Sequence, residues 1–224
     1  MCFHTIHYGW RIKEVGESLF PVQERYRLEK IYHGVVEKKY EFKPYVKVDR
    51  GDIVLDVGAY IGEFTIPVSS KAGMIIAVEP DPRNFYCLKR NTSHLRNVVL
   101  INKAAWTFKG TLDLHLGFRT TDSSLIGVDE KPLGKAVRVR VDTLDNIVRG
   151  LSIKEVDFIK IDAEGAEPEV LEGARDLLKI TRKVAIDCTP ERHGKPTSSI
   201  CSNILKNAGF RVHITPSNMV FAWK

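Results

Sequence analysis

The sequence predicts an α/β domain in which helices cover both faces of a mostly parallel β-sheet. Two observations carry this prediction. From Asp52 onward, short apolar runs alternate with helical patterns, which is the order of βαβ units. The runs are apolar throughout, as strands buried on both faces must be. The expected parallel strands are IVLDV (53–57), MIIAVE (74–79), VVLIN (98–102), VDFIKID (156–162) and KVAID (183–187).

Two of the intervening helices begin where an acidic residue precedes proline. Asp81 can cap the free amides of a first turn that begins at Pro82, and this helix carries Phe85 and Leu88. Glu167 begins the second helix, whose apolar residues have the spacing of one buried helical stripe. That stripe consists of Val170, Leu171, Ala174, Leu177 and Leu178.

The C-terminal part of the chain predicts a last helix and a closing hairpin. The helix lies near Ser199–Asn207 and ends at Gly209, a residue that suits a helix C-terminus. The runs RVHI (211–214) and MVFAW (219–223) follow as two strands, and the Pro-Ser-Asn sequence between them favours a turn.

Residues 110–141 interrupt the alternation and predict an inserted β-hairpin. The segments 111–116 and 137–141 alternate polar and apolar residues, which is typical of half-exposed antiparallel strands. The polar stretch 117–136 between them is long for a loop in a compact domain. Such a loop is either functional, as a lid over a binding site, or disordered, and the sequence leaves both open.

Residues 1–50 are interpreted as an N-terminal appendage to a domain of residues 51–224. Leu28, Ile31 and Tyr32 have helical spacing, and YEFKPYVKV (40–48) favours an extended segment. We expect this appendage to shield an edge of the sheet or to wall a pocket.

Composition excludes several protein classes. Of 224 residues, 43% are hydrophobic and 28% are charged, which is ordinary for a globular domain. The cysteines (Cys2, Cys87, Cys188 and Cys201) are not in CxxC pairs, so neither a disulfide framework nor a metal site is expected. No signal pattern or membrane-spanning run is present, which predicts a cytoplasmic protein. A net charge of +6, spread along the chain, permits nucleic acid as a partner without favouring it.

The stretch VLDVGAYIGEF (54–64) predicts a loop that binds a nucleoside. Gly58 and Gly62 lie between a buried strand and a helix, where the backbone turns tightly and presents its amides. A dinucleotide loop has the pattern GxGxxG, whereas Ala59 and Tyr60 stand here where the second glycine is needed. Close approach of a pyrophosphate is therefore disfavoured.

Two acidic residues add to this interpretation. Asp56 would repel a diphosphate but could accept hydrogen bonds from an ammonium group. Glu79 ends the second strand, 21 residues after Gly58, where an acidic residue can accept both ribose hydroxyls. Together the glycines and acids describe a ligand in which a nucleoside is joined to an amino acid.

The chain resembles the FkbM family of class I S-adenosylmethionine-dependent methyltransferases over roughly residues 51–187. The resemblance lies in a few motifs, of which IDAEGAE with VDTLD ahead of it is the most specific; Tyr60 replaces the asparagine that is usual in the first motif. These motifs are GDIVLDVGAYIGEFT (51–65), AVEPDPRNFYCLKRN (77–91), NKAAW (102–106), VDTLDNI (141–147) and VDFIKIDAEGAEPEVLEGA (156–174).

The resemblance implies a Rossmann-like fold with a seven-stranded sheet, and S-adenosyl-L-methionine as the cofactor at the carboxyl ends of the parallel strands. It implies that Asp56, Gly58 and Gly62 hold the methionine part, with Ala59 and Tyr60 in the same loop, and that Thr65 adds a hydroxyl. It further implies that Glu79 holds the ribose. The residues expected near the adenine are Glu79, Pro80, Asn102, Lys103 and Ala104.

Transfer of a methyl group to an aliphatic hydroxyl requires removal of a proton, and carboxylates follow the fourth parallel strand. Asp162 and Glu164 are the candidate catalytic residues, and Asp162 is also expected to contact the cofactor. Glu167 has two interpretations, a functional carboxylate or a group that stabilises the helix N-terminus. His193 is a third candidate, because family members carry an acid and a histidine after the fifth strand; a solvated loop histidine is the alternative.

The leading hypothesis is O-methylation of a hydroxyl on a small molecule, sugar or glycan. An RNA methyltransferase is the alternative enzyme, which the positive charge suits, although the sequence has no Asn-Pro-Pro-Tyr-type motif and no compact basic region. A non-catalytic nucleoside-binding module is the alternative from another class, which the acids retained around the glycine loop disfavour.

Overall fold

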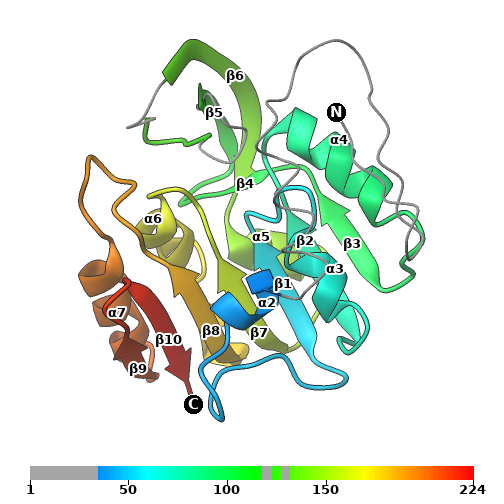
Figure 1. Ribbon diagram of the computed structural model, residues 1–224, viewed down its shortest axis with the longest axis vertical. Helices are drawn as coiled ribbons and strands as arrows, with labels where there is room; N and C mark the ends of the chain where they lie inside the picture. The colour runs from blue at the N-terminus through cyan, green and yellow to red at the C-terminus, as the bar shows by residue number, and fades with distance from the viewer. Residues whose placement is uncertain (1–34, 118–122, 128–131) are drawn as a thin grey trace.

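Figure 1 shows the computed structural model, which describes residues 35–117, 123–127 and 132–224. Its central sheet has seven strands in the order β3-β2-β1-β7-β8-β10-β9. Neighbouring strands are parallel except at β10, which is antiparallel to β8 and to β9. The prediction of a mostly parallel sheet with a closing hairpin is confirmed. The strands are β1 (Ile53–Val57), β2 (Met74–Val78), β3 (Val98–Ile101), β7 (Val156–Ile161), β8 (Thr181–Asp187), β9 (Arg211–Ile214) and β10 (Met219–Trp223).

Three parallel strands end one residue earlier than predicted. Glu79, Asn102 and Asp162 are therefore the first residues after β2, β3 and β7. Because β1, β2, β3 and β7 are all parallel, these residues lie at one edge of the sheet. At this edge the chain order reverses between β1 and β7, which is where open α/β sheets bind their ligands.

Helices cover both faces of the sheet, as predicted (Figure 1). Leu55 and Ile159 point to one face and pack with residues of α5, α6 and α7. Val54 and Phe158, one position earlier on the same strands, point to the other face and pack with Tyr40 and with α3. The helices are α2 (Val35–Lys39), α3 (Thr65–Val68), α4 (Pro82–Asn91), α5 (Leu144–Arg149), α6 (Glu167–Glu172) and α7 (Ser198–Asn207).

The helix predicted to run continuously from Glu167 through the apolar stripe is divided, so that prediction was wrong. α6 ends at Glu172, and a separate 3₁₀ helix, η4 (Leu177–Ile180), follows. The carboxylate of Asp145 accepts hydrogen bonds from the amides of Asp176 (3.1 Å) and Leu177 (2.7 Å), which a continuous helix would direct to its own carbonyls. The stripe itself is buried as predicted.

The predicted inserted hairpin forms part of a second, three-stranded sheet. Strands β5 (Gly110–Gly117) and β6 (Pro132–Asp142) pair antiparallel, and β6 also pairs in parallel with β4 (Ala104–Ala105). Along β6, Val139 and Val141 are buried whereas Arg138 is exposed, as period-two alternation predicts. The described part of the connecting loop, residues 123–127, returns to β5 through two backbone hydrogen bonds between His115 and Ser124.

The described N-terminal segment packs against the domain. Residues 40–48, expected to be extended, form a tight turn instead, closed by the backbone amide of Val46 donating to the carbonyl of Phe42 at 2.8 Å. Stacking of Phe42 on His213 and Phe221 holds this turn against the end of the sheet. The helix expected around Leu28 and the remainder of the predicted appendage, up to residue 34, lie outside the described residues.

Two further expectations concern the described residues. Their cysteines, Cys87, Cys188 and Cys201, are buried free thiols. Across residues 35–117, 123–127 and 132–224, no helix is long and apolar enough to cross a membrane.

Candidate active site

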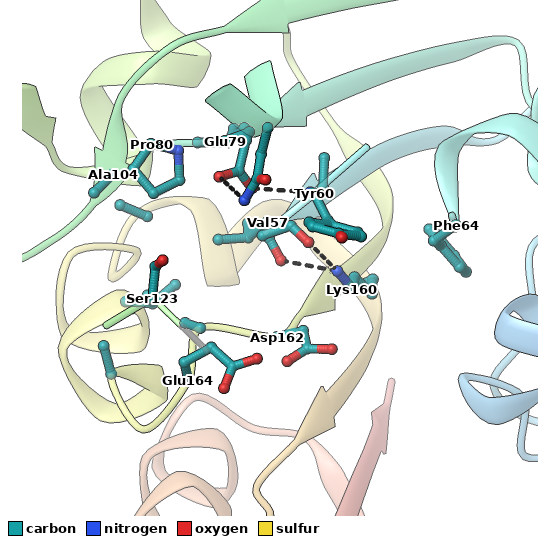
Figure 2. Close-up of a pocket in the computed structure, with 18 of the residues that line it drawn as sticks. Val57, Tyr60, Phe64, Glu79, Pro80, Ala104, Ser123, Lys160, Asp162 and Glu164 are labelled. Carbon is teal, nitrogen blue, oxygen red and sulfur yellow. Dashed lines mark hydrogen bonds between the residues drawn. The ribbon is translucent and has the colours of Figure 1, made fainter. Parts of the chain in front are cut away.

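A pocket opens at the carboxyl ends of β1 and β7, where the sheet order reverses. Its wall comes from the loops after β1, β2 and β7, from β4 and β5, from the loop residues Ser123 and Leu125, and from α2 and Tyr40. Figure 2 shows Glu79, Pro80 and Ala104 on one side of this pocket and Asp162 and Glu164 on the opposite side. The candidate residues that line it are Gly58, Ala59, Tyr60, Glu79, Pro80, Ala104, Asp162 and Glu164.

The glycine loop after β1 requires glycine for two physical reasons. Gly58 has φ +75°, and a Cβ atom there would lie 1.8 Å from the carbonyl oxygen of Asp162. Gly62 has φ +103°, and a Cβ atom there would meet the side chain of Ile66 at 2.8 Å. The backbone of the loop therefore turns tightly beside the pocket, as the sequence predicted.

Asp56 and Thr65 lie behind the loop and do not line the pocket. Asp56 is fully buried, and its Oδ2 accepts a hydrogen bond of 2.6 Å from the hydroxyl of Thr65. Its Oδ1 forms an ion pair of 3.0 Å with Lys160, whose Nζ also donates to the carbonyl of Gly58 at 2.6 Å. The expectation that Asp56 and Thr65 contact the ligand directly does not match this geometry, because both are engaged beneath the loop.

Lys160 is a pocket residue that was not predicted from the sequence. It lies on β7, is 4% exposed and contributes to the pocket wall (Figure 2). The signal was present, because a lysine in the apolar strand VDFIKI must find a buried partner or leave the sheet. The sequence could not show that the partner is Asp56.

Glu79 lies at the edge of the pocket with its carboxylate held by backbone amides. Tyr60 donates to Oε2 at 2.8 Å and Asp81 donates to Oε1 at 2.9 Å. Burial, with a smaller contribution from the charge of Asp81, raises the pKa of Glu79 to about 8. Glu79 thereby fixes the shape of both loops that border this side of the pocket.

Of the three candidates after β3, Ala104 alone lines the pocket. The side-chain amide of Asn102 donates to the carbonyls of Glu79 (2.8 Å) and Pro80 (3.2 Å), so it positions the loop after β2 from behind. Lys103 forms an ion pair of 2.8 Å with Asp142. The expectation that Asn102 and Lys103 lie against the ligand does not match this geometry.

Asp162 and Glu164 place carboxylates on the acidic side of the pocket. The hydroxyl of Tyr40 donates to Oδ2 of Asp162 at 2.6 Å, and Lys39 Nζ lies 3.8 Å from the same oxygen while forming an ion pair with Asp187. Glu164 has φ +51°, and its carbonyl accepts a hydrogen bond of 2.8 Å from Ser124. The inserted loop thus contacts the loop that carries the candidate catalytic residues.

The carboxylate of Glu167 bonds to the loop after β7 and to Thr197 rather than to the first turn of α6. It is fully buried and absent from the pocket wall. Its Oε1 accepts from the amides of Ala163 (3.2 Å) and Gly165 (2.9 Å), and its Oε2 accepts from the hydroxyl of Thr197 (2.7 Å). Burial raises the pKa of Glu167 to about 7 despite these donors. It holds the loop after β7 in shape.

His193 is exposed and does not line the pocket, whereas Glu191, two residues earlier, approaches the acidic side. One carboxylate oxygen each of Asp162, Glu164 and Glu191 lies within 4.8 Å of the others. Burial, and next the charge of Asp162, raises the pKa of Glu191 to about 8. Oxygen donors of this kind could hold a hard divalent cation. Nothing else in the described residues points to an ion.

The charge of the pocket favours a cationic ligand. Its acidic lining residues are Glu63, Glu79, Asp162 and Glu164, and its basic lining residues are Lys39 and Lys160. Both lysines are already paired with carboxylates, Lys39 with Asp187 and Lys160 with Asp56. The acidic lining residues other than Glu79, which keeps its proton up to about pH 8, complement positive charge.

Comparison with protein families gives a match over most of the chain. A family model described as "Methyltransferase FkbM domain" matches residues 56–212. The match begins within β1 and ends within β9, so it includes the loops that carry Gly58, Glu79 and Asp162.

Among known proteins, the hexuronic acid methyltransferase AglP of Haloferax volcanii is 23% identical over 172 residues, which cover 77% of this chain and 69% of AglP. The crystal structure of a methyltransferase FkbM from Methylobacillus flagellatus KT superposes with a TM-score of 0.56 at 18% identity, covering 81% of this chain and 46% of that one. This chain therefore spans about half of that structure.

A second solved structure has the same fold. Aeropyrum pernix fibrillarin, in complex with natively bound S-adenosyl-L-methionine, superposes with a TM-score of 0.51 at 16% identity, covering 86% of this chain and 76% of that one. The likeness confirms the Rossmann-like methyltransferase architecture that the strand order indicates.

Proposed function

The chain belongs to the FkbM methyltransferase family, and we propose that it methylates a hydroxyl group of a small molecule, sugar or glycan with S-adenosyl-L-methionine as the methyl donor. One observation carries this proposal. The carboxylate side of the pocket, at Asp162 and Glu164, lies opposite the Glu79–Pro80 side and beside the glycine loop (Figure 2). A nucleoside-linked donor and a hydroxyl acceptor could therefore bind against opposite sides of one cavity.

The residues of the donor side fit the proposed cofactor. The backbone of Gly58, Ala59 and Tyr60 would border its methionine part, with Gly62 shaping the loop away from the pocket. The side chain of Glu79 would accept from the ribose hydroxyls. Pro80 and Ala104 offer apolar surface to the adenine. When bound, S-adenosyl-L-methionine supplies an electrophilic methyl group on a cationic sulfur, and the acidic lining complements that charge.

Asp56, Thr65 and Asn102 have supporting roles in this proposal. Asp56 and Lys160 neutralise each other beneath the loop, and Lys160 holds the carbonyl of Gly58. Asn102 fixes the backbone of Glu79 and Pro80. These residues shape the donor side without touching the ligand.

The acceptor side is built to receive a hydroxyl. Asp162 and Glu164 present carboxylates that can accept a hydrogen bond from the acceptor hydroxyl and take its proton as the carbon–oxygen bond forms. Methyl transfer is an in-line displacement, so orientation of the acceptor oxygen contributes much of the rate. Similarity to AglP, a hexuronic acid methyltransferase, supports a sugar as the acceptor.

Calorimetry with S-adenosyl-L-methionine tests the donor half of the proposal. We expect saturable binding, and Glu79→Ala should weaken it by about 1–3 kcal/mol because its hydrogen bonds are lost. Glu172→Ala, an exposed acid at the end of α6, is the matched control and should bind as the unaltered protein does. Absence of heat at millimolar ligand would reject the proposed function.

Transfer of a labelled methyl group tests the acceptor half. The panel comprises hexuronic acid glycosides, neutral glycosides and bulk tRNA, each assayed across a salt series. Methylation of a glycoside hydroxyl is expected. Methylation of tRNA with a steep salt dependence would favour an RNA methyltransferase instead, and binding without transfer to any acceptor would favour a nucleoside-binding module.

A further inference from the structure

Part of the pocket comes from residues that precede the family match. Val36, Lys39 and Tyr40 line the pocket, whereas the matched region begins at residue 56. These residues lie on the acceptor side, since Tyr40 and Lys39 both approach Asp162. The described N-terminal segment is therefore a component of the site rather than only a cover for the sheet.

Tyr40 is enclosed by its neighbours. Its side chain is 1% exposed, and its ring meets that of Phe64 edge to face at 5.4 Å. Burial, and next the nearby charge of Asp162, raises the pKa of the Tyr40 hydroxyl well above its usual value of 10.0. The hydroxyl therefore stays protonated, and in the 2.6 Å hydrogen bond Tyr40 is the donor and Asp162 the acceptor.

Lys39 also lies near the carboxylate of Asp162. Its ammonium group pairs with Asp187 and lies 3.8 Å from Oδ2 of Asp162. A short hydrogen bond to an ionised acceptor is roughly twice as strong as a neutral one. Tyr40 is the better orienting group of the two, because its side chain is buried whereas the Lys39 side chain is 43% exposed.

We propose that Tyr40 is a positioning residue for methyl transfer and acts through Asp162, by holding its carboxylate in one orientation toward the acceptor. The inference rests on the proposed function, because it assigns Asp162 to the acceptor rather than to the cofactor. A purely structural Tyr40 would contribute packing against Phe64, to which its hydroxyl adds nothing. The two roles therefore separate when the hydroxyl alone is removed.

The experiment uses Tyr40→Phe, which keeps the ring and deletes the hydroxyl. Tyr45→Phe is the matched control, because Tyr45 is in the same segment, is 50% exposed and does not line the pocket. We expect Tyr40→Phe to lower kcat by about 10- to 100-fold, the scale of a misplaced catalytic group, with the Kd for S-adenosyl-L-methionine unchanged within about twofold. The acid limb of the pH profile of kcat should also shift to higher pH, because the ionised carboxylate loses a donor.

Asp162→Asn provides the second arm of the test. If Tyr40 acts through Asp162, then Tyr40→Phe changes kcat less than about twofold in the Asp162→Asn background. Melting temperatures give a readout that is independent of turnover. They are measured for the unaltered protein, for Tyr40→Phe, for Asp162→Asn and for the double variant. The shifts of the two single variants should not add in the double variant, because Tyr40→Phe removes this hydrogen bond and Asp162→Asn replaces its charged acceptor with a neutral amide oxygen.

The two measurements distinguish failure of the proposed function from failure of the Tyr40–Asp162 coupling. An unaltered protein that neither binds the cofactor nor transfers a methyl group rejects the proposed function, whereas additive melting-temperature shifts reject the Tyr40–Asp162 coupling whatever the activity. A functional enzyme in which Tyr40→Phe matches Tyr45→Phe in kcat and pH profile overturns the inference. Equal losses of kcat in both backgrounds overturn it as well.

Discussion

The backbone of Gly58 lies directly against that of Asp162. A Cβ atom on Gly58 would be 1.8 Å from the carbonyl oxygen of Asp162 and 3.0 Å from its carbonyl carbon. This contact joins the loop after β1 to the loop after β7, and so joins the proposed donor side of the pocket to the acceptor side. It also explains why the first position of this loop accepts no side chain.

Gly58→Ala should destabilise the protein by at least about 3 kcal/mol, since it combines a positive φ with a clash against backbone. The free energy of unfolding in urea measures the effect. Gly209→Ala is the control, because Gly209 has φ +86° but no atom within 4 Å of the added Cβ. Equal losses in the two variants would show that the clash is relieved and that φ alone matters.

Lys160→Met should destabilise the protein by about 3–5 kcal/mol, because it leaves the carboxylate of Asp56 buried without its cation. Adding Asp56→Asn should recover part of that loss. Lys179→Met is the control, since Lys179 pairs with Asp176 on an exposed surface and should leave the midpoint of unfolding almost unchanged. If adding Asp56→Asn restored no stability, loss of the buried ion pair would not be the cause of the destabilisation.

The stability of the ligand-free protein should fall as pH rises through about 8. Folding raises the pKa of Glu79 from 4.5 to about 8, so between these values the folded protein keeps a proton that the unfolded chain releases. The stability that this proton contributes is fully present below pH 4.5 and is lost above about pH 8. Glu167 and Glu191, whose pKa values are also raised, act in the same direction.

Melting temperatures from pH 5 to 9 test this expectation, with Glu79→Gln as the variant. It should flatten the fall without abolishing it, because Glu167 and Glu191 still titrate. Glu172→Gln, which alters an exposed acid, should keep the full fall. A Glu79→Gln curve parallel to that of the unaltered protein would contradict the assignment.

Asp162→Asn should lower kcat by about 100-fold or more, the usual contribution of a general base, while the Kd for S-adenosyl-L-methionine changes little. Steady-state kinetics and calorimetry measure the two quantities separately. Asp113→Asn, which alters an exposed ion pair with Arg138, is the control. Parallel losses of kcat and cofactor affinity would instead assign Asp162 to the cofactor.

Much of the fold was predictable because the determining signals are local. Apolar runs predicted the strands at the correct places, including β1, β9 and β10 to the residue. The error at α6 arose from a contact between distant segments. The carboxylate of Asp145 accepts hydrogen bonds from the amides of Asp176 and Leu177 in place of helical carbonyls. The spacing of apolar residues along the helix does not reveal this interaction.

The candidate site was partly predictable for the same reason. Glycine positions and strand ends placed Gly58, Glu79 and Asp162 at one edge of the sheet, and all three line the pocket. Asp56, Thr65, Asn102 and Lys103 were assigned to the ligand because they occupy suitable positions along the chain. Which way each side chain points depends on its partner, and the partners lie elsewhere in the sequence.

By itself, the sequence determined the sheet, the sharp loop after β1 and the set of acidic residues at the strand ends, because periodicity and glycine conformation act within a few residues. Only the tertiary structure decided which charges meet. Lys160 neutralises Asp56 from the neighbouring strand, and Tyr40 reaches Asp162 across a separation of 122 residues. Such contacts follow from packing, since a buried charge or hydroxyl must bond whichever partner the fold brings within reach.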